Sequence, residues 1–256
     1  MTEQRLSDRV ALVTGSSRGI GAAIATRLAA DGAKVVLHAR DDATRANEVA
    51  EKIRGAGGVA DVVLGDLESS EAPVRIVHEA FALHGQLDIL VCNAATGAGG
   101  LAIDADLQKI ERCLAVNLRA TILAATEFAR VTRSPHGRIV VISSGAAIHP
   151  SYGSSLYAAA KAGADAFARC AAQEFGERGI TVNTVMPGTT ETDLIAGIPA
   201  FDKVPRWTAL RRNGQPSDIA DIVAFVVSDD ARWLTGATVP ANGGLVTGAS
   251  NILAYT

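Results

Sequence analysis

Short apolar runs rich in valine and isoleucine recur along the chain and alternate with alanine-rich segments that have helical spacing. The runs expected to be strands are Val10–Thr14, Lys34–Ala39, Val59–Gly65, Leu87–Cys92, Arg138–Ser143, Ile180–Met186 and a last one near Ala237–Pro240. The clearest helical segments between them are Ile20–Ala30, Ala43–Ala56 and Pro73–Leu83. Near-continuous apolar strands separated by helices are typical of a parallel sheet that is covered on both faces. The alternation therefore predicts an α/β fold of the Rossmann type, a doubly wound parallel sheet of about seven strands.

No proline- or serine-rich linker and no internal repeat interrupts this alternation, so residues 1–256 are interpreted as a single domain. The segment 191–215 differs, because prolines and glycines (Gly197, Pro199, Pro205, Gly214) interrupt it. It is expected to be a loop with short helices, and a loop of this length in a compact domain usually acts as a lid or binding element. Its apolar side chains would pack on the body of the protein or contact an apolar substrate; they are Leu194, Ile195, Ile198, Phe201 and Trp207.

Composition excludes several classes of protein. Hydrophobic residues make up 48% and charged residues 20% of the chain, which excludes a disordered polypeptide. Lys plus Arg number 24 against 27 for Asp plus Glu, a net charge of −3, so no nucleic acid or anionic membrane is expected as a partner. No stretch approaches the ~18 apolar residues of a membrane span. The N-terminus is polar, so we expect a cytoplasmic protein.

The cysteines and histidines predict neither disulfides nor a metal site. The three cysteines have no C-x-x-C spacing, which fits a reducing compartment, and each is expected to be a small core residue. The five histidines share no metal-ligand spacing. Of these, His38, His78, His84 and His136 are expected on the surface, and His149 is a candidate for the mouth of a substrate site.

A glycine-rich turn separates the first predicted strand from the first helix, with the sequence Thr14-Gly15-Ser16-Ser17-Arg18-Gly19-Ile20-Gly21. Glycines there permit a tight turn and a close approach to a pyrophosphate, while the helix N-terminus presents free N–H groups to the phosphates. The G-x3-G-x-G spacing differs from the common G-x-G-x-x-G, and an ordinary strand-to-helix turn is the alternative. The position favours a dinucleotide site; the residues predicted to bind are Gly15, Ser17, Arg18, Gly19, Ile20 and Gly21.

The end of the second predicted strand, Lys34–Ala39, should lie beside the adenine ribose of that dinucleotide. An NAD enzyme usually places an acid there, whereas the 2′-phosphate of NADP requires a cation. Arg40 follows the strand directly, and Arg18 faces the same pocket in this topology. These guanidinium groups predict NADP(H), with NAD the less favoured cofactor; the alternative is that both are solvated charges. Asp41 and Asp42 weaken the argument, although Asp42 could cap the next helix.

Asp66 follows the third predicted strand in the sequence Gly65-Asp66-Leu67. Its carboxylate could accept a hydrogen bond from the adenine amino group, or it could cap the helix that follows. The sequence leaves both possibilities open.

Tyr157 and Lys161 lie four residues apart in a strongly helical stretch. Four residues are about 400° of rotation, so both side chains share one helix face. A tyrosine is a poor base near neutral pH, and an adjacent ammonium favours the phenolate that general acid–base catalysis needs. Ser144 ends the fifth predicted strand, at the sheet edge where ligands bind. A Tyr-x3-Lys pair alone is weak evidence, because exposed helices often carry such pairs by chance.

Together these motifs resemble the short-chain dehydrogenase/reductase family over essentially the whole chain. The matching residues are Thr14-Gly15-x3-Gly19-x-Gly21, Asp66-Leu67, Asn93-Ala94, Asn117 within Val116-Asn117-Leu118, Ser144, Tyr157, Lys161, and Pro187-Gly188 with Thr190 and Thr192. The resemblance implies a strand order 3-2-1-4-5-6-7 and a homotetramer assembled through the helices around 107–131 and 155–178 and the C-terminal strand.

The resemblance also implies a role for each residue. Tyr157 would exchange a proton with the substrate oxygen, Ser144 would orient that oxygen, and Lys161 would hold the nicotinamide ribose. Asn117 would support a water relay. The Pro187-Gly188 segment would close over the nicotinamide. The family's glycine after Asn93-Ala94 is replaced by Ala95, and its late Asp-Gly-Gly by Asn242-Gly243-Gly244; the first change leaves the cofactor geometry there open.

We therefore expect an NADPH-preferring carbonyl reductase, or an alcohol dehydrogenase in the reverse direction, acting on a small molecule. The Tyr-x3-Lys spacing resembles that of the family's carbonyl reductases, since its enoyl reductases space the pair further apart. A 3-oxoacyl carrier-protein reductase is the closest resemblance within the family. The rival hypotheses are a non-catalytic NADPH-binding redox sensor and an S-adenosylmethionine-dependent methyltransferase, which would leave the Tyr–Lys pair without a role.

Overall fold

One parallel sheet organises the protein, which we describe from a computed structural model over residues 4–193 and 199–245. Its strands are β1 (Val10–Val13), β2 (Lys34–Ala39), β3 (Val59–Leu64), β4 (Ile89–Cys92), β5 (Arg138–Ile142), β6 (Thr181–Pro187) and β7 (Thr238–Ala241). They are ordered β3-β2-β1-β4-β5-β6-β7, and every neighbouring pair is parallel. The predicted fold class and the strand order implied by the resemblance are confirmed.

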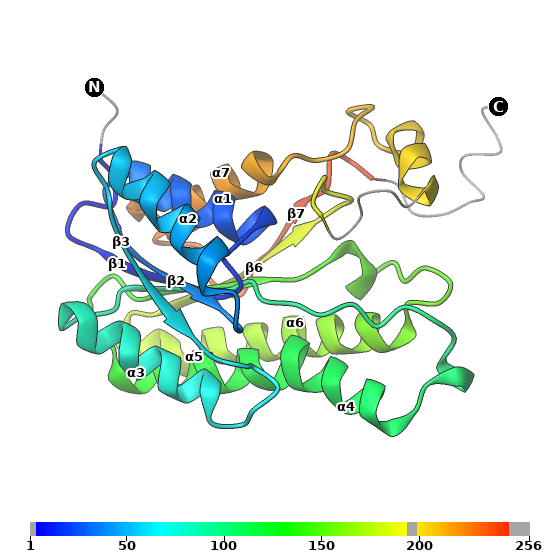
Figure 1. Cartoon of the computed structure of the whole chain (residues 1–256), viewed down its shortest axis with the longest axis horizontal. Helices are drawn as coiled ribbons and strands as arrows, with labels where there is room; N and C mark the ends of the chain where they lie inside the picture. The colour runs from blue at the N-terminus through cyan, green and yellow to red at the C-terminus, as the bar shows by residue number, and fades with distance from the viewer. Residues whose placement is uncertain (1–3, 194–198, 246–256) are drawn as a thin grey trace.

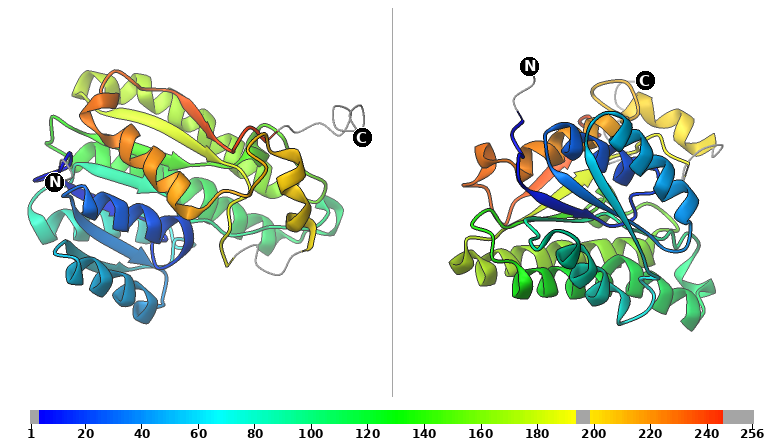
Figure 2. Two further views of the ribbon diagram at one scale, coloured as in Figure 1. Left: turned by 90° about the horizontal axis from the view of Figure 1, so that it is seen from above. Right: turned by 60° about the vertical axis from the view of Figure 1, so that its left-hand side comes forward.

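Helices cover both faces of the sheet (Figures 1 and 2). On one face lie α1 (Gly19–Ala30), α2 (Ala43–Gly55) and α7 (Pro216–Val227); on the other lie α3 (Ala72–His84), α4 (Leu107–Leu114), α5 (Ala120–Val131) and α6 (Ser155–Phe175). A π-helical stretch, η2 (Ala115–Arg119), joins α4 to α5. Short 3₁₀ segments complete the described chain: η1 (Ala102–Asp104), η3 (Gly145–Ala147), η4 (Gly176–Arg178), η5 (Pro199–Trp207) and η6 (Asp229–Ala231).

The side chains of the strands contribute to two hydrophobic cores, one on each face of the sheet. Along β1, Val10 and Leu12 pack with α3, α5 and α6, whereas Ala11 and Val13 pack with α1 and α7. All four residues of β1 are fully buried. Successive strand side chains point to opposite faces, so a strand covered on both sides must be apolar throughout. This is why the runs in the sequence are continuous rather than alternating.

The segment 191–215 combines a helical stretch with irregular chain, in agreement with the sequence pattern. Its base is tied by a bridge between Thr190 and Gly214 and by a 2.7 Å bond from the Gln215 amide to Glu191. Trp207 is half-exposed. The apolar positions 194, 195 and 198 lie outside the described residues, as does the side chain at 201, so their contacts with the body or a substrate remain predictions.

Some expectations about single residues are wrong. Cys92 and Cys113 are buried as predicted, but Cys170 is exposed, because it lies on the outer side of α6. The side chain of His84 is only 12% exposed and contacts Asp61 on β3 instead of solvent. None of the described helices is long and apolar enough to cross a membrane. Within the described ranges, no group of three or more His, Cys, Asp or Glu side chains could hold a metal ion.

The turn between β1 and α1 is packed so closely that its glycines have no space for a side chain. Gly15 has a φ of +63°, and a Cβ on it would lie 2.8 Å from the Ala94 Cα. A Cβ on Gly21 would lie 2.4 Å from the Gly15 carbonyl oxygen and 2.5 Å from the Asn93 amide nitrogen. Both distances are far below van der Waals contact. The backbone of α1 therefore lies directly against the turn and against the chain that follows β4.

This packing predicts that Gly21→Ala lowers the free energy of unfolding by about 1–3 kcal/mol, the usual cost of forcing an extra methyl group into a packed site. Gly55→Ala is the matched control, because Gly55 also lies in a helix but a Cβ on it would meet nothing within 4 Å. That variant should be neutral or slightly stabilising. Denaturant unfolding of both variants checks the prediction, and equal stabilities would contradict it.

Candidate active site

The loops that follow β1, β4, β5 and β6 meet at the carboxyl edge of the sheet. In a doubly wound sheet this edge is where ligands bind. The glycine-rich turn, Asn93-Ala94, Ser143-Ser144 and Pro187-Gly188 follow these four strands in order. Because β1, β4, β5 and β6 are successive neighbours in the sheet, these segments lie in one row.

Tyr157 and Lys161 occupy the first turns of α6, at the same edge. The Lys161 Nζ lies 5.8 Å from the centre of the Tyr157 ring. Lys161 is 3% exposed, and its Nζ donates a 2.8 Å hydrogen bond to the Ile142 carbonyl oxygen at the end of β5. This bond holds the ammonium beside the strand that leads to Ser144. The predicted pairing of the two side chains on one helix face is therefore present, with the ammonium buried and the tyrosine partly exposed.

Ser144 follows β5 in an extended conformation and caps the short helix η3. Its Oγ accepts a hydrogen bond of 3.2 Å from the Ala146 N–H. The next helix in the chain, α6, packs directly against η3. The serine hydroxyl is thereby held by its own loop, on the strand whose end also anchors Lys161.

Asn117 is fully buried within the π-helical stretch η2. Its side-chain amide donates to the carbonyl oxygens of Thr96 and Cys113, both at 3.0 Å, and its Oδ1 accepts from the Thr96 N–H at 3.2 Å. π-helical turns insert an extra residue into a helix and often occur at functional sites. Here the turn directs the Asn117 side chain to the loop after β4, and η2 also packs against α6. The sequence did not reveal this local geometry.

The N-terminus of α1 has the features of a phosphate-binding site. No side chain caps this helix at Arg18, so the N–H groups of its first turn have no cap. Gly19 has a φ of +57° and exposes its backbone because it has no side chain. A Cβ at this position would lie 3.3 Å from the Thr192 methyl group. Uncapped N–H groups and the helix dipole suit an anion such as a diphosphate. Ser17 lies partly exposed in this turn, and Ile20 packs into the core.

Asn93 and Ala94 hold the glycine-rich turn from the side of β4. The Asn93 amide donates to the carbonyl oxygens of Thr14 and Gly15, at 2.9 and 3.0 Å. The backbone N–H groups of Asn93 and Ala94 both donate to the Thr14 hydroxyl, at 2.9 and 3.0 Å. These residues therefore position the turn. Ala95, the alanine that replaces the family's glycine, is exposed.

The expectation that His38 lies on the surface is wrong, because its side chain is buried and only 2% of the residue is exposed. Its ring accepts a hydrogen bond from the Gly15 N–H at Nδ1, at 3.1 Å, and contacts the Gly65 carbonyl oxygen through Nε2, at 2.9 Å. A histidine directly after three apolar residues of β2, Val35, Val36 and Leu37, was the available signal. Sequence reasoning missed it because a strand end can face solvent or the neighbouring turn, and only the tertiary structure distinguishes the two.

The arginines predicted to recognise a 2′-phosphate are both exposed and pair with different carboxylates. Arg40 bonds Asp41 at 3.1 Å, and Arg18 lies 4.0 Å from Asp193. Arg45, which the sequence analysis missed, lies 3.7 Å from the same Asp193 carboxylate. One carboxylate at the base of the 191–215 segment is thus placed between guanidinium groups of the glycine-rich turn and of α2. Arg18 and Arg45 thus share one anion, whereas the binding of a 2′-phosphate by Arg18 and Arg40 stays a prediction.

Asp66 does not cap the helix after β3, so that alternative is wrong. Its Oδ1 accepts a hydrogen bond from the Glu68 N–H at 2.9 Å, and α3 begins only at Ala72. Asp66 is exposed and Leu67 is buried. Asp42, by contrast, does cap α2, through a 3.1 Å bond from the Arg45 N–H.

The Pro187-Gly188 segment continues β6 into the base of the 191–215 segment. A Cβ on Gly188 would lie 2.9 Å from the Asn242 Cα, so the chain after β6 passes directly over the turn that follows β7. The Thr190 hydroxyl donates to the Gly188 carbonyl oxygen at 3.1 Å. The methyl group of Thr192 faces Gly19 at the start of α1. These contacts place the base of the segment over the glycine-rich turn.

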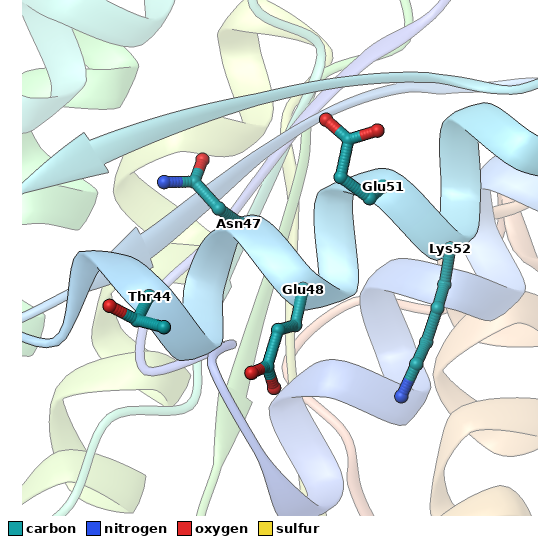
Figure 3. A pocket seen from close by; sticks show the side chains of 5 residues that line it. All are labelled: Thr44, Asn47, Glu48, Glu51 and Lys52. Atoms are coloured by element: carbon teal, nitrogen blue, oxygen red, sulfur yellow. The ribbon is translucent and has the colours of Figure 1, made fainter.

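A hollow on the outer surface of α2 is unrelated to this edge. Figure 3 shows its lining side chains, all from that one helix: Thr44, Asn47, Glu48, Glu51 and Lys52. Among the described residues, those that line it all belong to α2. The carboxyl edge of the sheet remains the place where several elements bring polar groups together.

Comparison with known proteins agrees with this geometry. Residues 15–246 match the family model described as Enoyl-(Acyl carrier protein) reductase. The chain is 41% identical over 252 residues to the short-chain dehydrogenase/reductase FrzI of Cladobotryum sp., covering 94% of this chain and 97% of that protein. It is 34% identical over 260 residues to a "Probable tetrahydroxynaphthalene reductase" of Zymoseptoria tritici, covering 93% and 95%.

Among solved structures, a short chain dehydrogenase from Burkholderia cenocepacia J2315 in complex with NADP is 41% identical. The two superpose with a TM-score of 0.90, over 94% of this chain and 99% of that one. The family model spans most of the chain, and the relatives match it at 34–41% identity over nearly their full length. The chain belongs to the short-chain dehydrogenase/reductase family of oxidoreductases.

Proposed function

We propose that this protein is an NADP(H)-dependent oxidoreductase that transfers a hydride between nicotinamide and a carbonyl or hydroxyl carbon. Tyr157 acts as the general acid and base. The observation that carries the proposal is the placement of the Tyr157–Lys161 pair. It lies at the same sheet edge as the uncapped N-terminus of α1, so a dinucleotide bound there would extend toward the phenol. When bound, the cofactor supplies the hydride.

The side chains at this edge can handle the substrate oxygen. In reduction, the Tyr157 hydroxyl gives its proton to that oxygen, while the Ser144 hydroxyl orients it by a hydrogen bond. The buried Lys161 ammonium, 5.8 Å from the Tyr157 ring centre, opposes the negative charge that the phenolate carries after the transfer. Asn117 stabilises the η2 turn beside α6. A water path that passes this turn would carry a proton from solvent back to Tyr157.

The positive charges around the adenosine side favour NADP(H) over NAD(H). Arg18 and Arg45 already share one carboxylate, that of Asp193, and Arg40 lies at the end of β2. A 2′-phosphate would take the place of that carboxylate with more charge and more acceptor oxygens. The Burkholderia relative that contains NADP supports the same choice. We expect Asp66 and Leu67, beyond β3, to contact the adenine.

Exposed apolar side chains lie on the loops after β4 and β5, which leave the same sheet edge as the Tyr157–Lys161 pair, and they favour an aromatic or cyclic ketone as substrate. The loops after β4 and β5 are joined by a 2.9 Å bond from the Gly100 N–H to the Gly153 carbonyl oxygen. Exposed apolar residues lie on both loops: Leu101, Ile103, Ile148 and Tyr152. The Zymoseptoria relative is named for an aromatic substrate, tetrahydroxynaphthalene, which agrees with such a surface. Exposed His149 lies on the same loop as Ile148.

The rival hypotheses predict different behaviour. A methyltransferase has no use for a buried ammonium beside a phenol, and a redox sensor would not need the intact set of Ser144, Tyr157 and Lys161. A 3-oxoacyl carrier-protein reductase remains the alternative within the same chemistry. We retain the single domain and the homotetramer as predictions.

Tyr157→Phe tests the general acid. It removes one hydroxyl and keeps the ring, so kcat with NADPH and a ketone should fall by about 10²-fold or more. The affinity for NADPH, measured by quenching of nicotinamide fluorescence, should stay within a few-fold of wild type. An active Tyr157→Phe variant would exclude this proton donor, and a wild type that never oxidises NADPH with any ketone or aldehyde would exclude the proposed function.

Arg18→Ser and Arg45→Ser test the cofactor preference. Each removes one charge-assisted bond to the 2′-phosphate, so the Kd for NADPH should rise about tenfold while that for NADH changes little. Lys52→Ser is the control, because it removes an exposed positive charge from α2 away from the turn. If the ratio of the two Kd values does not move, the cations do not recognise the 2′-phosphate.

Ile103→Gln and Ile148→Gln test the exposed apolar side chains of the loops after β4 and β5. Each should raise KM for a bicyclic aromatic ketone such as a tetralone by about three- to tenfold, since each removes roughly 1 kcal/mol of apolar contact. KM for a small β-ketoester should change less. Leu83→Gln, at an exposed position on α3, is the control. Equal effects on both substrates would argue against an aromatic substrate at these loops.

A further inference from the structure

One buried histidine connects three strand ends beneath the glycine-rich turn. His38, at the carboxyl end of β2, accepts from the Gly15 N–H through Nδ1 at 3.1 Å and meets the Gly65 carbonyl oxygen through Nε2 at 2.9 Å. Its backbone adds two further bonds to Ser16: the Ser16 N–H donates to the His38 carbonyl oxygen, and the His38 N–H donates to the Ser16 Oγ, both at 2.9 Å.

These bonds define the state of the ring. The Gly15 N–H can only donate, so Nδ1 must offer a lone pair, and the single ring proton of the neutral form must lie on Nε2. There it donates to the Gly65 carbonyl oxygen. A second proton could be added only at Nδ1, where it would face the Gly15 N–H donor. The ring therefore fits its surroundings in one tautomer and in the neutral form alone.

We propose that His38 is a positioning residue for the cofactor phosphates: its neutral Nε2–H form holds the Gly15 N–H in place, and protonation breaks that bond and weakens cofactor binding in acid. The inference rests on the proposed function, since the ligand of the turn is the diphosphate of NADP(H). Asn93 holds the Gly15 carbonyl oxygen from the other side. Protonation of His38 thus removes its side-chain bond to Gly15 and leaves the Asn93 bond and the backbone bonds to Ser16.

The charged groups around the ring shift the pKa of His38 in opposite directions. Burial lowers the pKa of His38 below its usual value and is the largest cause. The bond to the Gly65 carbonyl raises this pKa, as does the Asp66 carboxylate beyond β3, while Arg75 on α3 lowers it. The ring is therefore neutral near pH 7, which is the state that the bonds to the turn require.

Because folding lowers the pKa of His38, acid weakens the contribution of His38 to stability. The pKa is lower in the folded protein than the value of 6.5 that applies to the unfolded chain, so the unfolded chain binds the proton more readily. The contribution of His38 to stability is complete above pH 6.5 and is lost as the pH falls through that value toward the folded pKa. Cofactor affinity should decline in the lower part of the same window.

The test measures the Kd for NADPH by fluorescence between about pH 5 and 8, for the wild type, His38→Asn and His38→Ala. Asparagine keeps an acceptor for the Gly15 N–H that cannot be protonated, whereas alanine removes it. The 2′-phosphate of NADPH titrates near pH 6 itself, so the comparison between variants, and not the wild-type curve alone, carries the result. His78→Asn is the control for removing a histidine, because His78 is an exposed residue of α3.

At pH 8, His38→Asn should bind NADPH within about threefold of wild type, and His38→Ala should bind it about tenfold more weakly, the effect of one lost hydrogen bond. Between pH 7 and 5, the wild type and the control His78→Asn should lose more affinity for NADPH than His38→Asn, because only they carry a histidine at position 38 that acid can protonate. Parallel curves for wild type and His38→Asn would overturn the proposal.

A second measurement uses only the wild type without cofactor. The amide hydrogen-exchange protection of Gly15 should fall between pH 7 and 5, whereas that of Val140, in the centre of the sheet on β5, should not. Unchanged protection at Gly15 would also overturn the proposal. A wild type that fails to bind NADPH at any pH would instead refute the proposed function, so the two failures are distinguishable.

Discussion

The close approach of the β1–α1 turn to the strand ends is the constraint on which the rest of the site depends. Gly15 and Gly21 bring backbone against backbone, with no space for a Cβ at either position. His38 from β2 and Asn93 from the chain after β4 then hold the turn on both sides. The N–H groups at the start of α1 are available to phosphates because packing, and not a capping side chain, determines where the helix begins.

The other half of the site comes from the opposite face of the sheet. Figure 1 shows α1 above the strands and α6 below them, so the phosphate-binding turn and the Tyr157–Lys161 helix can meet only at the carboxyl edge. The buried Lys161 ammonium is anchored to the last residue of β5. The parallel sheet thus fixes the position of the phosphate-binding turn relative to the Tyr157–Lys161 helix, although the two lie on opposite faces.

The sequence predicted the strands to within a few residues, and β2 at its true bounds, because a strand buried on both faces must be apolar from end to end. It also predicted that Tyr157 and Lys161 share a helix face, since that follows from helix geometry alone. It misjudged His38, left open whether Asp66 caps the next helix, and missed Arg45, which lies beside Asp193. Each of these depends on which loops lie beside one another, and spacing along the chain contains no information about that.

The sequence by itself determined the fold class, the glycine-rich turn and the spacing of the residues proposed to carry the chemistry, because hydrophobic periodicity and helical rotation are local properties. Only the tertiary structure decided that His38 is a buried acceptor, that Asn117 is directed by a π-helical turn, and that Arg18 and Arg45 share Asp193. Those outcomes arise from hydrogen bonds and ion pairs between segments tens of residues apart, which form only after the sheet has brought the strand ends together.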